Sequence, residues 1–282
     1  MHRVRRGDII KGARVAVVGA GPAGISAAIQ LKKEGVAFEL YERKDVGGLL
    51  NYAYRVDNLL GHAGKSGPEI CKEFRDHLDI MGVQVVKKDI SKIERSSIGF
   101  TIDGEKFTHL VLATGSVPRR LDLPGALFHL EPEHLQKGGR LLIVGGGDLA
   151  FDNALRAAAS GMLVTVLIRD RPSANETLLN EARSMGVNEA EGDALEIVPR
   201  GESFLFRNRT YDNVAVFIGR TPNRTLIDHL GDLPAEPPFF TTSIKGLYIV
   251  GDAALGTLSQ TALASGSGIA AAMHIARAVR GR

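Results

Sequence analysis

Cysteine is almost absent from this chain, which has a single one, Cys71, among its 282 residues. A lone cysteine excludes an internal disulfide framework, and no dithiol within the chain can receive electrons. It also fits a reducing compartment, so we expect the protein to be cytoplasmic. Because an isolated cysteine in a predicted helix is usually buried, we expect the Cys71 thiol to be packed rather than reactive.

Aromatic residues, net charge and long apolar runs are also scarce. The chain has no tryptophan, an aromatic content of 6% and a formal net charge of +3. These values argue against a base-stacking platform and against binding to nucleic acid. No stretch approaches the ~18 consecutive apolar residues of a membrane helix, so we expect no membrane span.

One group of polar residues has the side-chain types of a metal site, between residues 129 and 134. It contains His129, Glu131, Glu133 and His134. With no sulfur ligand nearby and a proline within the group, a solvated linker is the better interpretation, and we expect no metal.

Glycine, by contrast, is abundant, with 33 residues, and two turn motifs contain three of them each. The first, Gly19-Ala20-Gly21-Pro22-Ala23-Gly24, follows the apolar run 15–18, and the second, Gly145-Gly146-Gly147-Asp148-Leu149-Ala150, follows 141–144. Each reads as strand, tight turn and helix, which presents backbone N–H groups and a helix N-terminus to a pyrophosphate. Two such turns predict two dinucleotides, most simply a flavin and a nicotinamide.

The residues that follow each turn support the same interpretation. Glu42 lies roughly 20 positions beyond Gly19, the spacing at which an acidic residue binds the ribose hydroxyls of an adenosine. Arg169 lies at a matching distance beyond Gly145. The similar spacing indicates an internal duplication of a nucleotide-binding module.

Hydrophobic periodicity and glycine stops predict the elements around these turns. We expect helices over 25–34, 68–82, 149–160 and 260–279. We expect strands over 36–41, 83–86, 109–113, 163–168 and 247–250. The alternation predicts an α/β fold of two Rossmann-like, doubly wound, three-layer dinucleotide-binding domains.

Several segments, in the correct order, resemble the low-molecular-weight thioredoxin reductase family of two-dinucleotide-binding flavoproteins. Besides the first glycine turn with its acid, they are Gly47–Leu50, Val56–Gly61, Leu112–Pro118, Val216–Asn223, Gly251-Asp252 and the helix that follows Gln260. The resemblance implies a discontinuous FAD domain, 1–117 and 243–282, with a trimmed NAD(P)-binding-like domain, 118–242, inserted in it. It also implies hinges near Pro118 and Thr242, and a homodimer.

The resemblance, together with the glycine turns, assigns cofactor-binding residues. For FAD they are Gly19, Gly21, Pro22, Ala23, Gly24, Glu42, Arg43, Gly48, Leu49, Asn58, Ala113, Thr114, Gly115, Gly251, Asp252, Gln260 and Thr261. For NADPH or NADH they are Gly145, Gly147, Asp148, Ala150, Arg169 and Arg171. No catalytic side chain is assigned.

The chain departs from the family where the family carries a Cys-x-x-Cys-Asp segment. The corresponding stretch, 125–137, is short and has no cysteine. Leu49 replaces a glutamine beside the flavin, Ser259 replaces an arginine, and the segment 186–211 is abbreviated. Ferredoxin–NADP reductases of the same fold also lack the dithiol, so this departure favours that branch.

The coenzyme of the second site stays open between NADPH and NADH. Arg169 or Arg171 could clamp a 2′-phosphate, whereas Asp170 would repel it and favour a free hydroxyl. A trimmed domain that binds no nicotinamide, or binds a different nucleotide, is an alternative.

The sequence leads to two hypotheses of function. The first is an NAD(P)H-dependent FAD oxidoreductase that passes electrons to an external acceptor: a ferredoxin-like protein, a quinone or oxygen. The second is a FAD-binding regulatory subunit that docks a redox partner and has a vestigial nicotinamide site.

Overall fold

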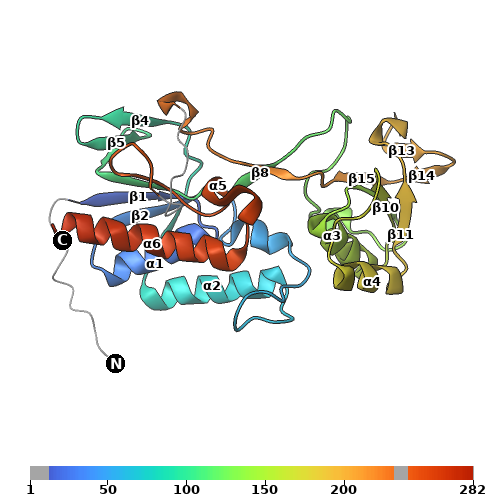
Figure 1. Ribbon diagram of the computed structural model, residues 1–282, viewed down its shortest axis with the longest axis horizontal. Helices are drawn as coiled ribbons and strands as arrows, with labels where there is room; N and C mark the ends of the chain where they lie inside the picture. Colours follow the sequence, from blue (N-terminus) through green and yellow to red (C-terminus); the bar gives the residue numbers. More distant parts are fainter. Residues whose placement is uncertain (1–12, 232–240, 282) are drawn as a thin grey trace.

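The structure is a computed structural model that describes residues 13–231 and 241–281. Two α/β domains lie side by side, and an extended connection that includes strand β8 (Ser116–Pro118) joins them (Figure 1). The first domain contains both described ends of the chain, and the second is formed by its middle part (Figure 1).

The first domain is built on a five-stranded parallel sheet in the order β17-β7-β1-β2-β3. Its strands are β1 (Arg14–Val18), β2 (Ala37–Glu42), β3 (Val85–Lys87), β7 (His109–Leu112) and β17 (Leu247–Ile249). The apolar run Val15–Val18 lies at the centre of this sheet because both of its faces are covered. Since β17 comes from near the C-terminus, the two ends of the chain share one sheet.

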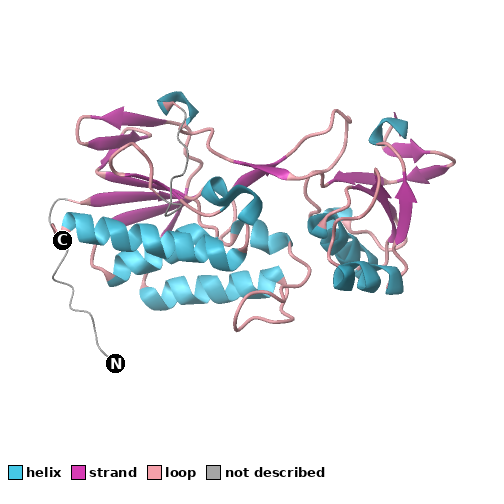
Figure 2. Ribbon diagram, viewed as in Figure 1, coloured by secondary structure: helices cyan, strands magenta, loops and turns pink. Residues whose placement is uncertain are grey.

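Three helices cover one face of that sheet: α1 (Pro22–Lys33), α2 (Gly67–Met81) and α6 (Thr261–Val279) (Figure 2). Helices α1 and α6 pack very closely at Gly268. A Cβ there would lie 2.0 Å from the carbonyl oxygen of Ala23, so only glycine allows this approach. The opposite face carries an antiparallel meander of β4 (Ile93–Ser96), β5 (Gly99–Ile102) and β6 (Glu105–Phe107). The domain therefore has three layers, as predicted.

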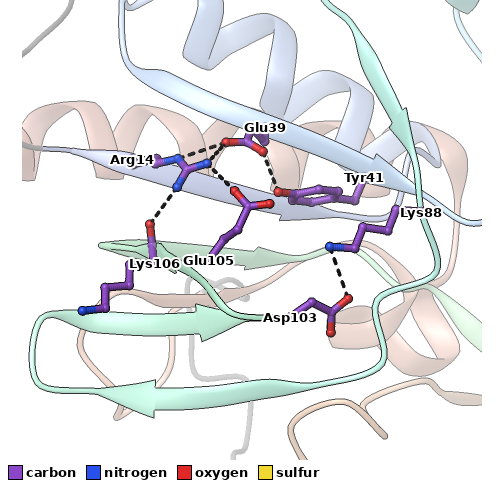
Figure 3. Close-up of polar contacts among 7 residues, drawn as sticks. All are labelled: Arg14, Glu39, Tyr41, Lys88, Asp103, Glu105 and Lys106. Carbon is purple, nitrogen blue, oxygen red and sulfur yellow. Dashed lines mark hydrogen bonds and ion pairs between the residues drawn. The ribbon is translucent and has the colours of Figure 1, made fainter.

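A polar network ties the meander to the parallel sheet (Figure 3). The Arg14 guanidinium on β1 donates to Glu39 on β2 and, at 2.6 Å, to Glu105 on β6. The Tyr41 hydroxyl donates to the second oxygen of Glu39 at 2.6 Å. The network lies close to the end of β2, whose last residue is Glu42.

The second domain repeats this plan with a four-stranded parallel sheet in the order β11-β10-β9-β15. Its strands are β9 (Arg140–Val144), β10 (Leu163–Ile168), β11 (Asn188–Glu191) and β15 (Asn213–Val216). Helices α3 (Asp148–Ala159) and α4 (Glu176–Ser184) pack on one face. A short meander, β12 (Ile197–Arg200), β13 (Ser203–Phe206) and β14 (Arg209–Tyr211), packs on the other.

Two short strands connect the domains. Strands β8 (Ser116–Pro118) and β16 (Arg220–Pro222) pair antiparallel. Arg220 strengthens the pair by donating from Nε to Ser116 Oγ at 2.9 Å and from Nη2 to the Ser116 carbonyl at 2.7 Å. Beyond this pair, Ile227 packs in the core of the first domain.

The remaining short helical turns are 3₁₀ helices or brief α-turns. They are η1 (Gly48–Tyr52), η2 (Pro132–His134), η3 (Ala194–Glu196), η4 (Asp228–Leu230), α5 (Asp252–Leu255) and η5 (Gly256–Leu258). No helix in the described part of the chain is long and apolar enough to cross a membrane.

Candidate functional site

The first glycine turn leaves an open space in front of helix α1. Gly19 has a φ of +107°, and a Cβ there would lie 2.3 Å from the Ala113 carbonyl oxygen. A Cβ on Gly24 would lie 1.8 Å from the Gly19 carbonyl oxygen, whereas a Cβ on Gly21 would meet nothing within 4 Å. Gly19 and Gly24 are thus needed for packing, and Gly21 faces free space. Helix α1 begins there without a side-chain cap, so its N–H groups can bind an anion.

The Glu42 carboxylate lies at the end of β2 beside this turn. One oxygen accepts from the Ala20 N–H at 2.7 Å, and the other accepts from the Lys44 N–H at 2.9 Å. These bonds hold the acid next to the glycine turn, where the spacing argument places the ribose of an adenosine.

A second glycine pair, Gly47-Gly48, continues from this edge into η1. Both have positive φ, +106° and +56°. The Gly47 N–H donates to the Ala20 carbonyl at 2.8 Å, so the pair is tied to the first glycine turn. A Cβ on Gly47 would lie 2.2 Å from Cys71 Sγ, which packs directly beneath it.

Cys71 is fully buried on α2, as the sequence predicts. Burial raises the pKa of its thiol to about 11. A thiol in this setting is protonated at neutral pH and is a poor nucleophile.

The last helix approaches the same region from the other end of the chain. Helix α6 begins at Thr261 without a side-chain cap. The Asn58 amide donates to the Gln260 side-chain oxygen at 2.6 Å, which joins two predicted site residues across the fold. Gly251 has a φ of +63°, and its N–H donates to Ser267 Oγ at 2.9 Å, which fixes the turn that carries Asp252.

The second glycine turn has the same construction at the start of α3. A Cβ on Gly145 would lie 2.4 Å from the Phe217 carbonyl oxygen, and Ala150 is fully buried against this turn. Gly147 precedes α3, which again has no side-chain cap. The Asp148 carboxylate accepts from the Asn175 N–H at 2.9 Å, so it fixes the following loop to the helix start.

One cavity of about 1440 Å³ connects these parts. It is larger than the ~300–1,000 Å³ of an ordinary small-molecule site. The predicted residues that line it are Gly19, Gly21, Pro22, Ala23, Glu42, Arg43, Gly48, Leu49, Asn58, Ala113, Thr114, Gly115, Gly251, Asp252, Gln260, Thr261 and Asp148. Leu149, Asp152, Thr177 and Leu178 of the second domain line it too. The start of α3 therefore opens into the space that the first glycine turn faces.

Six predicted site residues are not among those that line the cavity. Gly24, Gly145 and Ala150 serve the tight packing of turn against helix. Gly147 lies in the turn before α3. Arg169 and Arg171 are exposed after β10, and no ion pair within 13–231 and 241–281 involves either of them.

The model of the pyridine nucleotide-disulphide oxidoreductase family matches residues 13–268. The chain belongs to this family.

Proteins similar to this chain include thioredoxin reductases and a ferredoxin–NADP reductase. The chain is 27% identical to the thioredoxin reductase of Chlamydia trachomatis, over 94% of this chain and 98% of that protein. It is 35% identical to the ferredoxin–NADP reductase of Ignicoccus hospitalis, over 54% of this chain and 55% of that protein. The crystal structure of Lactococcus lactis thioredoxin reductase superposes with a TM-score of 0.83 at 23% identity, covering 96% of this chain and all of that one (100%).

These similarities confirm the predicted fold class and the predicted family resemblance. The cofactor prediction, FAD with a nicotinamide nucleotide, is confirmed at the level of the pyridine nucleotide-disulphide oxidoreductases. The chain is an oxidoreductase of the FAD-dependent kind found in that family.

Sequence reasoning missed a polar group between the two domains of this oxidoreductase. The Tyr52 hydroxyl donates to Glu131 at 2.9 Å, and its ring stacks on His129 with centroids 5.1 Å apart. Burial, followed by hydrogen bonding to Glu131, raises the pKa of Tyr52 to about 12. Burial, followed by the nearby Arg220, lowers the pKa of His129. The segment interpreted as a solvated linker is thus half-buried at His129 and Glu131; no local pattern marks that contact.

No group of three or more His, Cys, Asp or Glu side chains that could hold a metal ion occurs in the part of the chain described.

Proposed function

We propose that this chain is an NAD(P)H-dependent FAD oxidoreductase that passes electrons to an external acceptor without an internal dithiol. The observation that carries the proposal is the single cavity shared by both dinucleotide turns. It allows a nucleotide bound at the start of α3 to reach the same space as one bound at the start of α1.

The fold supports a FAD site in the first domain. The uncapped start of α1, with open space at Gly21, suits the pyrophosphate, and Glu42 suits the adenosine ribose. The Gly47-Gly48 turn, tied to Ala20 and packed on Cys71, forms the floor of the cavity at Gly48. FAD, when bound, supplies reversible hydride chemistry. The uncapped start of α6 would stabilise negative charge on the reduced ring.

The second domain supports a nicotinamide nucleotide less completely. Gly147 and the uncapped start of α3 offer a pyrophosphate site, and Asp148 and Asn175 hold the loop beside it. Arg169 and Arg171 are exposed and carry no ion pair within the described residues, which suits a 2′-phosphate, but Asp170 lies between them. We therefore propose NADPH as the coenzyme, with NADH as the alternative.

The acceptor must approach the cavity directly. Cys71 is the only thiol in the chain, and it is buried with a raised pKa, so it offers no route for electrons. The candidate acceptors are a ferredoxin-like protein, a quinone or oxygen.

Steady-state assays with NADPH and each acceptor test this part of the proposal. Ferricyanide, a benzoquinone, an oxidised ferredoxin and a protein disulfide are compared as acceptors in the wild type and in Cys71→Ser. We expect turnover with at least one of the first three, and the same rate in both proteins. Turnover with the disulfide alone, abolished in Cys71→Ser, would overturn the proposed route.

A further inference from the structure

The segment 52–57 of the first domain forms hydrogen bonds with helices α3 and α4 of the second domain. Arg55 donates from Nη1 and Nη2 to the two carboxylate oxygens of Glu181 at 2.6 Å and 2.7 Å, in a bidentate pair. Its Nε donates to Asp57 at 2.8 Å, which orients the guanidinium. The Tyr54 N–H donates to Asp152 Oδ2 at 2.9 Å. The Tyr54 ring packs on the core of the second domain.

The geometry and partial burial of these contacts distinguish them from an ordinary surface ion pair. Arg55 and Glu181 are 33% and 26% exposed, so neither is fully screened by water. A bidentate arginine–carboxylate pair also fixes direction, because the planar guanidinium matches the two oxygens. Asp152 is half-buried, and backbone N–H groups of Tyr54 and Arg55 bind its carboxylate. We call this group the interdomain clasp; it consists of Arg55, Tyr54, Asp152 and Glu181.

The clasp residues of each domain lie close in sequence to residues of the same domain that line the cavity. On one side, segment 52–57 follows shortly after Gly48-Leu49, and both stretches line the cavity in the first domain. On the other side, Asp152 lies one turn after Asp148 on α3, and Glu181 lies one turn after Thr177 on α4. Residues four apart share a face of a helix. The faces of α3 and α4 that carry Asp152 and Glu181 therefore also carry residues that line the cavity in the second domain.

Apart from the clasp and the contacts of Tyr52 with Glu131 and His129, the connection between the domains is slender. The chain crosses between them along β8 and β16, a two-stranded pair with three residues in each strand. Such a pair can pivot with small changes in backbone angles. Without the clasp, the distance from the start of α3 to the floor at Gly48 would vary with that pivot.

We propose that the clasp holds the second domain in the orientation that permits hydride transfer, with Arg55, Asp152 and Glu181 as positioning residues. This inference rests on the proposed function. Hydride transfer needs the reacting atoms within ~3–3.5 Å, so a displacement of ~1 Å costs up to ~100-fold in rate. Because the second domain carries no dithiol, it has only the nicotinamide to bring to the flavin, and one held orientation is sufficient for turnover.

The test uses the FAD-loaded full-length protein in four forms: wild type, Arg55→Met, Glu181→Leu and the double variant. Anaerobic stopped-flow with NADPH gives the limiting rate of flavin reduction and the apparent Kd. We expect each single variant to lose about tenfold in limiting rate, with a much smaller change in Kd, because the pyrophosphate site on α3 is intact. The double variant should lose no more than either single one, because both remove the same contact.

Arg183→Met is the matched control. Arg183 also lies on α4 and forms an ion pair with Glu189 at 2.6 Å, but this pair lies within the second domain. We expect its limiting rate to equal that of the wild type. Thermal unfolding of all variants checks that the fold is retained.

Amide hydrogen exchange without nucleotide gives a readout that does not depend on catalysis. The peptide containing Tyr54 should exchange about tenfold faster in Arg55→Met and Glu181→Leu than in the wild type or Arg183→Met, because the clasp opens more often. A reducible wild-type flavin with variants that match the wild type in rate and exchange would overturn the clasp alone. A wild-type flavin that NADPH and NADH both leave oxidised would overturn the proposed function, and with it the role of the clasp.

Discussion

At Gly21 the fold tolerates a side chain, whereas the proposed ligand requires the space that a side chain would fill. Its φ of −76° suits any residue, and a Cβ there meets no protein atom. We therefore expect Gly21→Val to fold like the wild type but to lose FAD about tenfold, because the side chain enters the proposed pyrophosphate space. The ratio of absorbance at 450 nm to that at 280 nm, with a thermal melt of the apoprotein, measures both effects. A Gly21→Val protein purified with full flavin would contradict the assignment.

Cys71 shows how burial decides the chemistry of a residue. With a thiol pKa of about 11, it should react with a disulfide reagent at pH 7.5 at least ~100-fold more slowly in the native protein than after unfolding in urea. The reaction is followed by absorbance of the released thiolate. Rapid modification of native protein at neutral pH would show that the packing of Cys71 under Gly47 is wrong.

At the scale of elements, the Arg14 network joins β1, β2 and β6 (Figure 3). Arg14→Met should lower the free energy of unfolding by about 1 kcal/mol at pH 7, because it leaves the Glu39 and Glu105 carboxylates facing each other. Partial burial favours a higher pKa for Glu39, but hydrogen bonds from Tyr41 and Arg14 outweigh it and lower the pKa.

That direction fixes the pH dependence. A carboxyl whose pKa is lower in the folded state contributes stability above its unfolded pKa, 4.5 here, and loses it as pH falls through the folded value. The difference between wild type and Arg14→Met should therefore shrink below pH 4.5. Urea unfolding at pH 7 and pH 3.5 measures it. An equal difference at both pH values would contradict this account.

Sequence reasoning located the elements, but some of their boundaries differ from the expectation for local reasons. Strand β10 has the predicted bounds, 163–168. Helix α1 begins at Pro22 rather than at 25, because proline fits the first turn of a helix. Strand β3 begins at Val85 rather than at 83: the left-handed Gly82 ends α2, and the Val83 N–H still bonds the Leu78 carbonyl.

The contacts between domains could not be predicted in this way. Tyr54 and Asp152 are 98 positions apart, and Arg55 and Glu181 are 126 apart. Neither pair stands in any periodic pattern, because their proximity depends on how the two domains are placed. The glycine turns were found because their spacing is local.

At the scale of the whole molecule, α6 exposes three large apolar side chains to solvent. Leu263, Ile269 and Met273 are 47%, 40% and 38% exposed. Exposed apolar side chains on one helix favour association, so we expect the protein to be a homodimer in solution. Light scattering coupled to gel filtration should give twice the chain mass for the wild type. Ile269→Glu should give a monomer; a wild type that is monomeric at micromolar concentration would remove this expectation.

The shared cavity makes one measurement decisive for the molecule as a whole. The purified FAD-loaded protein is mixed anaerobically with NADPH, and separately with NADH, while the flavin absorbance near 450 nm is recorded. The account predicts rapid bleaching by at least one of them, in the wild type and in Cys71→Ser alike. A flavin that stays oxidised with both nucleotides, yet bleaches with dithionite, would contradict hydride transfer across the cavity.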